Sequence, residues 1–504
     1  MTEIRTTPGR QLLLVRFSGD ITTKAEATRK RFLQRMARNI KDALKASGAQ
    51  HTVIRTRDRI FVSLEGKDLE RGAADLQRVF GVQSLAPVKE LEWSSLDGLV
   101  RDAEAFFRDR VRSRFFAVRA RRVGERGSLP FRSGQVERDL GTALLPDAAG
   151  VNLRDPDVTV ALEIMPGTAY LFDERLEGPG GVPLGVESRG IALISGGFDS
   201  PVAAWLMMKR GVALDYVLCN LGGRQQQLET LAICKALADQ WSFGTRPHLH
   251  VVNFDGITRA LQDHVSTRIW QVVLKRFMLR AAQFVAEERD AQALITGEVV
   301  AQVSSQTLPN LAVISNATHL PILRPLVGFN KEEIIRHART IGTHDLSAQV
   351  GEYCALVPSR PATRTTERRV ATEEAAIDSS ILQRALEERT IYDLRTLDMA
   401  SLDQPGLHID HVPDGATLVD LRSKSAYDGW HYPGALFLDF ANALRVYAQL
   451  DRSQEYIVYC EFGLKSGHLA ELMQNEGLRA HHFSGGLSAL VAFAKSKGLP
   501  TPEL

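Results

Sequence analysis

The stretch Ile191-Ala192-Leu193-Ile194-Ser195-Gly196-Gly197-Phe198-Asp199-Ser200-Pro201 leads from an apolar strand through a glycine turn into a helix. Adjacent glycines let backbone N–H groups approach a phosphate closely. Ser195 and Ser200 add hydroxyl donors, and Pro201 suits the first turn of a helix, whose positive end favours an anion. No Gly-Lys-Ser/Thr closes the loop, so it is not a Walker loop. A phosphate-binding loop is favoured over the alternative, a purely structural turn.

The segments around this loop predict several domains. From residue 190 onward, strand-like and helix-like segments alternate, which indicates a doubly wound α/β sheet over residues 178–360. Two α+β units precede it, at 1–81 and 82–177, and a Gly- and Pro-rich stretch follows them. The polar stretch 361–400 is expected to be a linker, and 401–504 a smaller α/β unit. The predicted fold class is therefore multidomain, α/β and α+β.

Composition excludes several protein classes. The chain has 504 residues, 44% hydrophobic and 24% charged, which excludes collagen, disulfide miniproteins and general disorder. No run of about 18 apolar residues predicts a transmembrane helix, so no membrane association is expected. The N-terminus lacks the features of a signal peptide, so we expect a cytoplasmic protein. The four cysteines include no close pair and predict neither a disulfide framework nor a zinc or other metal site.

Charge is distributed unevenly along the chain. Residues 1–140 carry 29 Lys and Arg against 18 Asp and Glu, whereas the whole chain carries 62 against 60. A basic front on a mildly acidic body is typical of a protein that binds a polyanion such as a nucleic acid. Arg-rich helices that are merely well solvated remain the alternative.

The motif Ser195-Gly196-Gly197-Phe198-Asp199-Ser200 resembles the PP-loop of ATP pyrophosphatases, which split ATP between its α and β phosphates and adenylate a substrate oxygen. The resemblance implies ATP as a substrate and pyrophosphate as a product. Mg²⁺ is expected to neutralise the phosphates. Asp199 is the acidic group best placed to hold that metal or to orient the attacked oxygen.

Motifs further along the chain indicate which family of ATP pyrophosphatases the sequence resembles. They are Leu274 to Arg280, Thr296-Gly297-Glu298, Gln302 to Thr307 and Phe329 to Ile334. With the basic front and the last unit, they resemble the tRNA sulfurtransferase (4-thiouridine synthetase) family over essentially the whole chain. The resemblance implies an N-terminal ferredoxin-like domain at 1–81, a THUMP RNA-binding domain at 82–177, a PP-loop adenylation domain at 178–360 and a rhodanese-like domain at 401–504.

The same resemblance assigns an ATP site. It implies ATP contacts from Leu193, Ile194, Lys275, Gly297 and Gln306, besides the loop residues Ser195, Gly196, Gly197 and Ser200. It also implies that Asp199 and Lys331 act in activation. Independently, Asn330 is a good helix cap with Glu333 three residues on, so Lys331 should lie at a helix N-terminus, where anions bind. A solvated helix lysine is the alternative.

A cysteine at the end of a strand is the second reactive group. Cys460 to Ser466 follow the apolar segment YIVY and precede a helix. Backbone N–H groups and the helix dipole at such a position lower a thiol pKa, and the thiolate is the nucleophile. The loop resembles the rhodanese active loop, whose cysteine carries sulfur as a persulfide. The segments 419–422 and 432–435 match rhodanese landmarks, and Lys465 stands where many rhodaneses have Arg.

The other cysteines differ from Cys460 and from each other. Cys354 lies in a loop before a Pro-marked boundary, and by itself such a thiol is more often inert. The family resemblance implies instead that Cys354 is the second working cysteine, which forms a redox-active disulfide with Cys460 after sulfur delivery. Cys219 and Cys234 lie on an expected strand and helix and are interpreted as packing residues.

Basic residues of the first two units are the expected RNA contacts. The THUMP resemblance implies binding of the tRNA acceptor end, largely through shape and phosphate contacts. The expected contacts are Lys24, Arg31, Arg119, Arg121 and Arg122.

The resemblance implies an ATP-dependent tRNA sulfurtransferase. ATP would adenylate O4 of uridine 8. Persulfide sulfur on Cys460, supplied by an IscS-type cysteine desulfurase, would then replace the adenylated oxygen to give 4-thiouridine. The persulfide could also serve a ThiS-type carrier in thiamine biosynthesis. Two alternatives remain: a PP-loop ligase acting on a small metabolite, which would not need residues 1–177, and a non-catalytic tRNA-binding sulfur-relay adaptor, which would tolerate Asp199→Ala.

Overall fold

A computed structural model describes residues 9–56, 59–124, 127–350, 360–402, 406–461 and 463–502. The chain forms two compact units. The first comprises residues 1–187, 208–212 and 240–245, and the second comprises 188–207, 213–239 and 246–504. Within the described ranges, no helix has the length and apolar character needed to cross a membrane.

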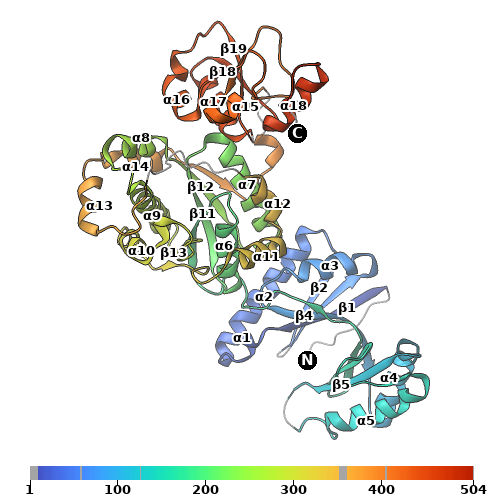
Figure 1. Ribbon diagram of the computed structural model, residues 1–504. Coiled ribbons are helices and arrows are strands. Elements are labelled where there is room, and N and C mark those ends of the chain that lie inside the picture. Colours follow the sequence, from blue (N-terminus) through green and yellow to red (C-terminus); the bar gives the residue numbers. More distant parts are fainter. Residues whose placement is uncertain are drawn as a thin grey trace. The chain divides into compact units, whose positions relative to one another are not determined.

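The first unit is built on a nine-stranded sheet of order β2-β3-β1-β4-β8-β7-β5-β6, with β9 also paired to β4 (Figure 1, blue to teal). Its elements are β1 (Arg10–Phe17), α1 (Gly19–Thr22), α2 (Glu26–Ala46), β2 (His51–Arg55), β3 (Ile60–Glu65), η1 (Gly66–Asp68), α3 (Leu69–Leu76), β4 (Val82–Glu92), α4 (Leu96–Val111), β5 (Phe115–Arg122), α5 (Ser133–Leu144), η2 (Leu145–Asp147), β6 (Gly150–Val151), β7 (Val158–Met165), β8 (Thr168–Phe172) and β9 (Leu176–Glu177).

Strand β4 joins the two expected α+β units into one sheet. Its residues from Val82 to Val88 pair antiparallel with β1, and those from Lys89 to Glu92 pair with β8. The boundary expected between residues 81 and 82 thus falls at the start of a strand whose hydrogen bonds serve both units. A single strand therefore couples the two expected α+β units.

Alternation along β1 explains why this strand lies at the centre. Leu13 and Val15 face a core that includes α2 and α3, whereas Leu12 and Leu14 face a second core formed with residues of β7 and β8. Successive side chains of a strand point to opposite faces, so both faces of β1 are covered. The helices α4 and α5 cover β5 and β7 in a third core.

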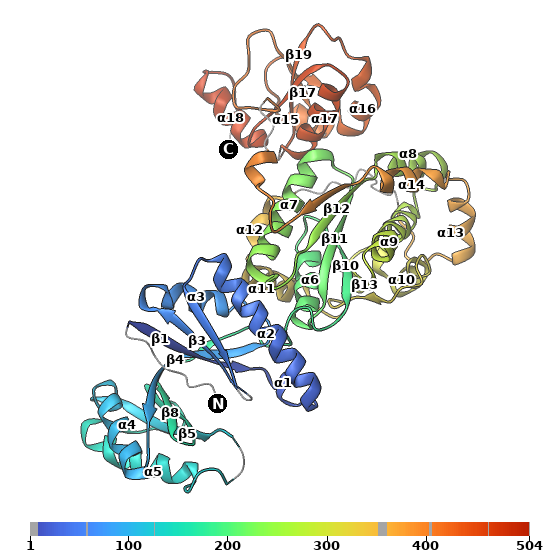
Figure 2. The ribbon, with the colours of Figure 1, turned by 180° about the vertical axis from the view of Figure 1, so that it is seen from behind.

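The second unit contains a six-stranded sheet of order β14-β13-β10-β11-β12-β15, parallel except for β15. Both ribbon views show α6, α7, α11 and α12 on one face, with α8, α9, α10, α13 and α14 on the other (Figures 1 and 2). The elements are β10 (Arg189–Leu193), α6 (Asp199–Lys209), β11 (Ala213–Asn220), α7 (Gly223–Trp241), β12 (His248–Asn253), α8 (Asp255–His264), α9 (Trp270–Glu288), β13 (Ala291–Ile295), η3 (Ser304–Gln306), α10 (Leu308–Ser315), β14 (Ile322–Leu323), α11 (Lys331–Ile341), α12 (His344–Gln349), α13 (Glu367–Glu374), α14 (Ser380–Glu387) and β15 (Thr390–Asp393).

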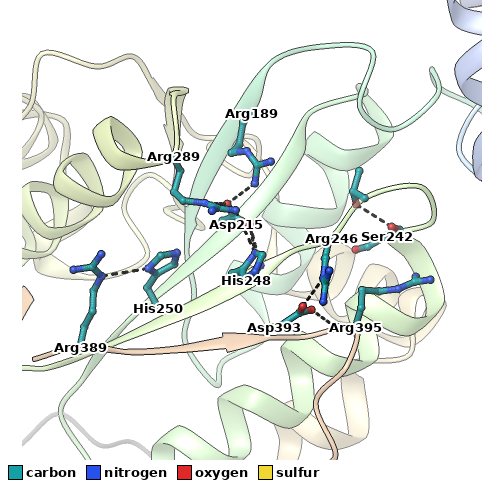
Figure 3. Close-up of polar contacts among 11 residues, drawn as sticks. Arg189, Asp215, Ser242, Arg246, His248, His250, Arg289, Arg389, Asp393 and Arg395 are labelled. Carbon is teal, nitrogen blue, oxygen red and sulfur yellow. Dashed lines mark hydrogen bonds and ion pairs between the residues drawn. The ribbon is translucent and has the colours of Figure 1, made fainter.

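The segment 361–400, expected to be a linker, is instead part of this α/β structure. Strand β15 pairs antiparallel with β12, and Asp393 forms an ion pair with Arg246 (Figure 3). On α13, Glu374 binds both Arg276 and Arg280 of α9, at 2.8 Å each. The charged residues that made this segment resemble a solvated linker therefore form ion pairs with the rest of the α/β structure.

A separate five-stranded parallel sheet, of order β16-β20-β19-β17-β18, forms the C-terminal part of the second unit. Helices α16 and α17 pack in a core on one face, and α18 packs on the other (Figure 2). The elements are η4 (Met399–Leu402), β16 (His408–Ile409), β17 (Thr417–Asp420), α15 (Lys424–Gly429), β18 (Leu436–Phe437), α16 (Phe440–Val446), η5 (Tyr447–Gln449), β19 (Glu455–Tyr459), α17 (Leu464–Asn475), β20 (Arg479–Phe483) and α18 (Gly486–Ser496).

Candidate active site

The glycine loop lies where a ligand site is expected in an open α/β sheet. Strand β10 is followed along the chain by β11 and β12 on one side, whereas β13 and β14 lie on its other side. The strand order therefore reverses at β10, and ligands bind beyond the carboxyl ends of the strands at such a point. The loop from Ile194 to Phe198 follows the carboxyl end of β10 and leads into α6.

Two serines close this loop on itself. The backbone N–H of Ser195 donates to Ser200 Oγ at 2.9 Å, and the two hydroxyl oxygens lie 3.1 Å apart. The N–H groups of Gly196 and Gly197 have no hydrogen-bond acceptor among the described residues. Free backbone donors at the start of a helix form a site suited to phosphate.

Packing requires glycine at two positions of the site. A Cβ on Gly196 would lie 2.2 Å from a methyl carbon of Val350, and one on Gly297 would lie 2.8 Å from the carbonyl carbon of Asp199. Gly297 therefore brings the end of β13 into direct contact with the start of α6. The loop and the Thr296-Gly297-Glu298 motif, about a hundred residues apart in sequence, form one site.

Asp199 and Lys331 meet at this edge of the sheet. Lys331 Nζ lies 2.9 Å from Asp199 Oδ1, and Gln302 Nε2 donates to Asp199 Oδ2 at 3.2 Å. The expected capping box of α11 is present, because Asn330 accepts from the Glu333 N–H and Glu333 accepts from the Asn330 N–H. Lys331 is thus fixed at the first position of α11, with its ammonium group at the phosphate loop.

The remaining expected ATP residues differ in burial and in their hydrogen-bond partners. Leu193 ends β10 half-buried, and Ile194 is buried. Lys275 Nζ is bound to Glu298 Oε1 at 2.9 Å. Gln306 Oε1 is buried and has no hydrogen-bond partner among the residues that the structure describes. A buried amide oxygen without a partner is costly, and a ligand donor such as a nucleotide amino or hydroxyl group would satisfy it.

Cys460 immediately follows the central strand β19. It is only 4% exposed, and its Sγ lies 3.5 Å from the hydroxyl oxygen of Ser466. Ser466 in turn donates to the Gly463 carbonyl at 2.9 Å, and Gly463 takes the left-handed conformation at the N-cap of α17. The strand, loop and helix expected around this thiol are therefore present.

The two landmark segments both contact the residue before Cys460. The Leu421 N–H donates to the Tyr459 carbonyl at 3.0 Å, and the Tyr432 N–H donates to the Tyr459 hydroxyl at 3.1 Å. Arg422 is buried and binds Asp420 through two nitrogens. These contacts fix the end of β19, and with it the position of Cys460.

The other cysteines take different places. Cys354 lies outside the described residues, so its pairing with Cys460 stays a prediction. Cys219 and Cys234 are free and buried, and burial raises the pKa of both thiols. Both are therefore packing residues with little thiolate character.

The expected RNA contacts are all exposed side chains of the first unit: Lys24, Arg31, Arg119, Arg121 and Arg122. Arg119 donates to the Leu153 carbonyl and Arg122 to the Phe131 carbonyl, while Arg121 has no side-chain partner within the described ranges. Arg121 and Arg122 also line a cavity of about 290 Å³ beside the start of α5. Arg35, in contrast, binds the carbonyls of Leu184 and Gly244 and is structural.

The sequence prediction missed three side chains that the structure places at this site: Gln302, Glu298 and Arg324. Gln302 binds Asp199, whereas Glu298 lies between Lys275 and Arg324. Gln302 and Glu298 had a weak signal in the sequence, since both lie in the motifs downstream of the loop, whereas Arg324 lies in none of them. Within the described chain, no group of three or more His, Cys, Asp or Glu side chains could hold a metal ion.

Comparisons with known proteins show which family the chain belongs to. Four family models match: "Thiamine biosynthesis protein (ThiI)" at residues 185–378, "ThiI ferredoxin-like domain" at 12–86, "THUMP domain" at 94–173 and "Rhodanese-like domain" at 406–492. A tRNA sulfurtransferase of Pyrobaculum aerophilum is 34% identical over 92% of this chain and 94% of its own length. The chain belongs to the tRNA sulfurtransferase family.

A second relative and a solved structure are also similar to this chain. A tRNA sulfurtransferase of Shewanella amazonensis is 33% identical over 92% of this chain and 98% of its own length. A solved structure, described as "Crystal structure of a 4-thiouridine synthetase - RNA complex with bound ATP", has 27% identity and a TM-score of 0.66, covering 76% of this chain and 99% of that chain. The multidomain fold class, with ferredoxin-like, THUMP, PP-loop and rhodanese-like parts, is thus confirmed.

Proposed function

We propose that this chain is an ATP-dependent tRNA sulfurtransferase that converts uridine 8 of tRNA to 4-thiouridine. The family's tRNA sulfurtransferases and the 4-thiouridine synthetase structure with RNA and ATP support this activity. The observation that carries it is the combination, on one chain, of the Asp199–Lys331 pair at a phosphate loop with a buried cysteine in a rhodanese-like loop.

In the adenylation step, the glycine N–H groups and the start of α6 bind the phosphates. Leu193 and Ile194 contact the nucleoside, Gln306 accepts a hydrogen bond from it, and Lys275 and Lys331 neutralise charge that develops as pyrophosphate leaves. Mg²⁺ commonly binds through one or two carboxylates together with substrate phosphates, and Asp199 is the carboxylate at hand. Uridine O4 attacks the α phosphate, so O4 becomes joined to AMP.

In the sulfur step, an IscS-type cysteine desulfurase loads Cys460 as a persulfide. The outer sulfur attacks C4 and displaces AMP together with O4, which joins the base to Cys460 through a disulfide. The Cys354 thiolate then attacks Cys460 Sγ, so that sulfur stays on C4 as 4-thiouridine and a Cys354–Cys460 disulfide forms. A dithiol reductant reopens that disulfide.

A second destination for the sulfur is proposed as well. The description of the matching family model as a thiamine biosynthesis protein favours donation to a ThiS-type sulfur carrier for thiazole synthesis. Both routes use the same Cys460 persulfide. We expect the enzyme to work in the cytoplasm, because its proposed substrate is tRNA.

The test is the nucleoside composition of tRNA. Mass spectrometry of tRNA from a deletion strain should show loss of 4-thiouridine, restored by the wild-type chain and not by Asp199→Ala. Restoration by Asp199→Ala would favour a non-catalytic adaptor, and unchanged 4-thiouridine in the deletion strain would favour a ligase acting on a small metabolite.

A further inference from the structure

Glu298 is a buried carboxylate shared by two cations beside the phosphate loop. Its Oε1 lies 2.9 Å from Lys275 Nζ, and its Oε2 lies 2.7 Å from Arg324 Nε and accepts from the Thr296 hydroxyl at 3.1 Å. Its side chain is 10% exposed, and those of Lys275 and Arg324 are about 21% and 17% exposed. We call these four residues the Glu298 cluster.

The charges of the Glu298 cluster do not balance. Two cations share one carboxylate, so one positive charge remains without a counterion inside the cluster. Burying an unbalanced charge is costly unless an anion is near. The adjacent residue, Gly297, touches the start of α6 at the phosphate loop, so the excess charge lies where a triphosphate is expected.

The pairing also limits the freedom of Lys275. A lysine has one of the most flexible side chains, and ordering it when a ligand binds lowers affinity. Glu298 holds the ammonium group at 2.9 Å, which limits the conformations open to the Lys275 side chain. Burial by itself raises the pKa of Glu298, but Lys275 and Arg324 outweigh it and the pKa is lowered, so the carboxylate stays charged at neutral pH.

We propose that Glu298 is a positioning residue for ATP: it holds Lys275 and Arg324 together beside the phosphate loop with one positive charge left for the nucleotide. The inference rests on the proposed function, because it takes Lys275 as an ATP contact. It assigns no chemical step to Glu298.

The chain contains a matched control at the opposite end of the strands of the same sheet. Asp215 is a fully buried carboxylate that, like Glu298, is bound by two cations: Arg189 and Arg289, near the start of β11 (Figure 3). Glu298→Gln and Asp215→Asn therefore remove the same kind of charge from the same domain. Only the first variant changes a group beside the phosphate loop.

The experiment measures ATP binding to the full-length chain by calorimetry, with the melting temperature of each variant. Glu298→Gln should weaken ATP binding at least tenfold, or about 1.4 kcal/mol, whereas Asp215→Asn should lower the melting temperature and leave ATP affinity within about twofold. Arg324→Gln keeps the Lys275–Glu298 pair but removes the excess positive charge, so it should also weaken ATP binding. This variant provides the test if Glu298→Gln does not fold.

Two outcomes overturn the inference and separate it from the proposed site. Unchanged or tighter ATP binding by Glu298→Gln, while Lys275→Ala binds ATP weakly, would leave Lys275 an ATP contact and make Glu298 only structural. Unchanged ATP binding by Lys275→Ala itself would remove the proposed ATP site, and the inference with it.

Discussion

Lys331 and Asp199, 132 residues apart in sequence, form an ion pair of 2.9 Å between Nζ and Oδ1 at the phosphate loop. Lys331 is 45% exposed, so its ammonium group can exchange Asp199 for a phosphate without unfolding. The same ammonium group lies 5.3 Å from the centre of the Phe198 ring. The pair therefore joins the capped start of α11 to the start of α6, at the place where the proposed adenylation occurs.

Replacing Lys331 should separate activation from sulfur loading. Lys331→Ala should lower the rate of tRNA-dependent AMP formation by roughly 10²–10³-fold, because the variant lacks a cation aimed at developing phosphate charge. Persulfide loading of Cys460 should be unchanged, since its loop lies on a separate sheet. AMP release and transfer of labelled sulfur from a desulfurase measure the two steps.

Lys235→Ala is the control for that variant. Lys235 forms an ion pair with Asp239 on α7, four residues away, and such surface pairs contribute at most about 1 kcal/mol. Both activities should stay near the wild-type level. A folded Lys331→Ala chain that fails to load sulfur would contradict the division of labour.

Exposed arginines of β5 should set the salt dependence of tRNA binding. Removing one phosphate-binding cation should reduce the log–log slope of affinity against salt by roughly 0.7–0.9. Arg121→Ala should do so with no loss of stability, because Arg121 has no side-chain partner within the described residues, whereas Arg122 also binds the Phe131 carbonyl. Filter binding over a range of salt measures the slope, and a tRNA affinity independent of salt would exclude phosphate contacts as its basis.

The buried Glu163 of β7 should make the first unit sensitive to acid. Burial raises its pKa, but Arg59 and Arg16 outweigh this, and the folded pKa lies below the ordinary glutamate value of 4.5. A lowered folded pKa adds stability above the unfolded value, and that stability is lost as the pH falls through the folded value. Glu163→Gln should cost about 3–5 kcal/mol at pH 7, because two arginines stay buried without their carboxylate.

Thermal unfolding at several pH values tests this. The difference in melting temperature between wild type and Glu163→Gln should be largest near neutral pH and shrink below about pH 4. A difference that does not vary with pH would mean that the charge of Glu163 does not stabilise the unit.

Replacing either of the two cysteines with a proposed role in sulfur transfer should block a different step. Cys460→Ser should lose both persulfide loading and thiolation, because Cys460 lies in the strand-loop-helix setting that suits a persulfide anion. Cys354→Ser should load sulfur but turn over poorly, with no intramolecular disulfide. Labelled cysteine with a desulfurase, followed by non-reducing peptide mapping, distinguishes the variants. The proposed roles would be reversed if the labelled sulfur were found on Cys354 and the Cys460→Ser variant still thiolated tRNA.

Local patterns in the sequence predicted the parts of the fold that local physics determines. The strand, glycine turn and helix around Ser195, the capping box at Asn330 and the loop after Tyr459 each depend on residues close together in the chain. Family resemblance added Lys275, Gln306 and Lys331, which spacing alone would not have joined to the loop.

Contacts between distant segments were not predictable in this way. Strand β15 follows a charged helical stretch, and nothing in its four residues indicates that it pairs with β12, which lies far earlier in the chain. Glu298 likewise gains its proposed role from Lys275 on α9 and from Arg324, which directly follows β14. The joining of the two expected α+β units, 1–81 and 82–177, into one sheet likewise follows from pairing on both halves of β4.

The most direct test of the central claim is a reconstituted reaction containing unmodified tRNA, ATP, Mg²⁺, cysteine, a cysteine desulfurase and the purified chain. Digestion and mass spectrometry of the tRNA should show 4-thiouridine at position 8, with one AMP formed for each sulfur transferred. Omission of ATP or replacement of Cys460 by serine should abolish the formation of 4-thiouridine. AMP formation that needs no tRNA and leaves the tRNA without 4-thiouridine would contradict the account.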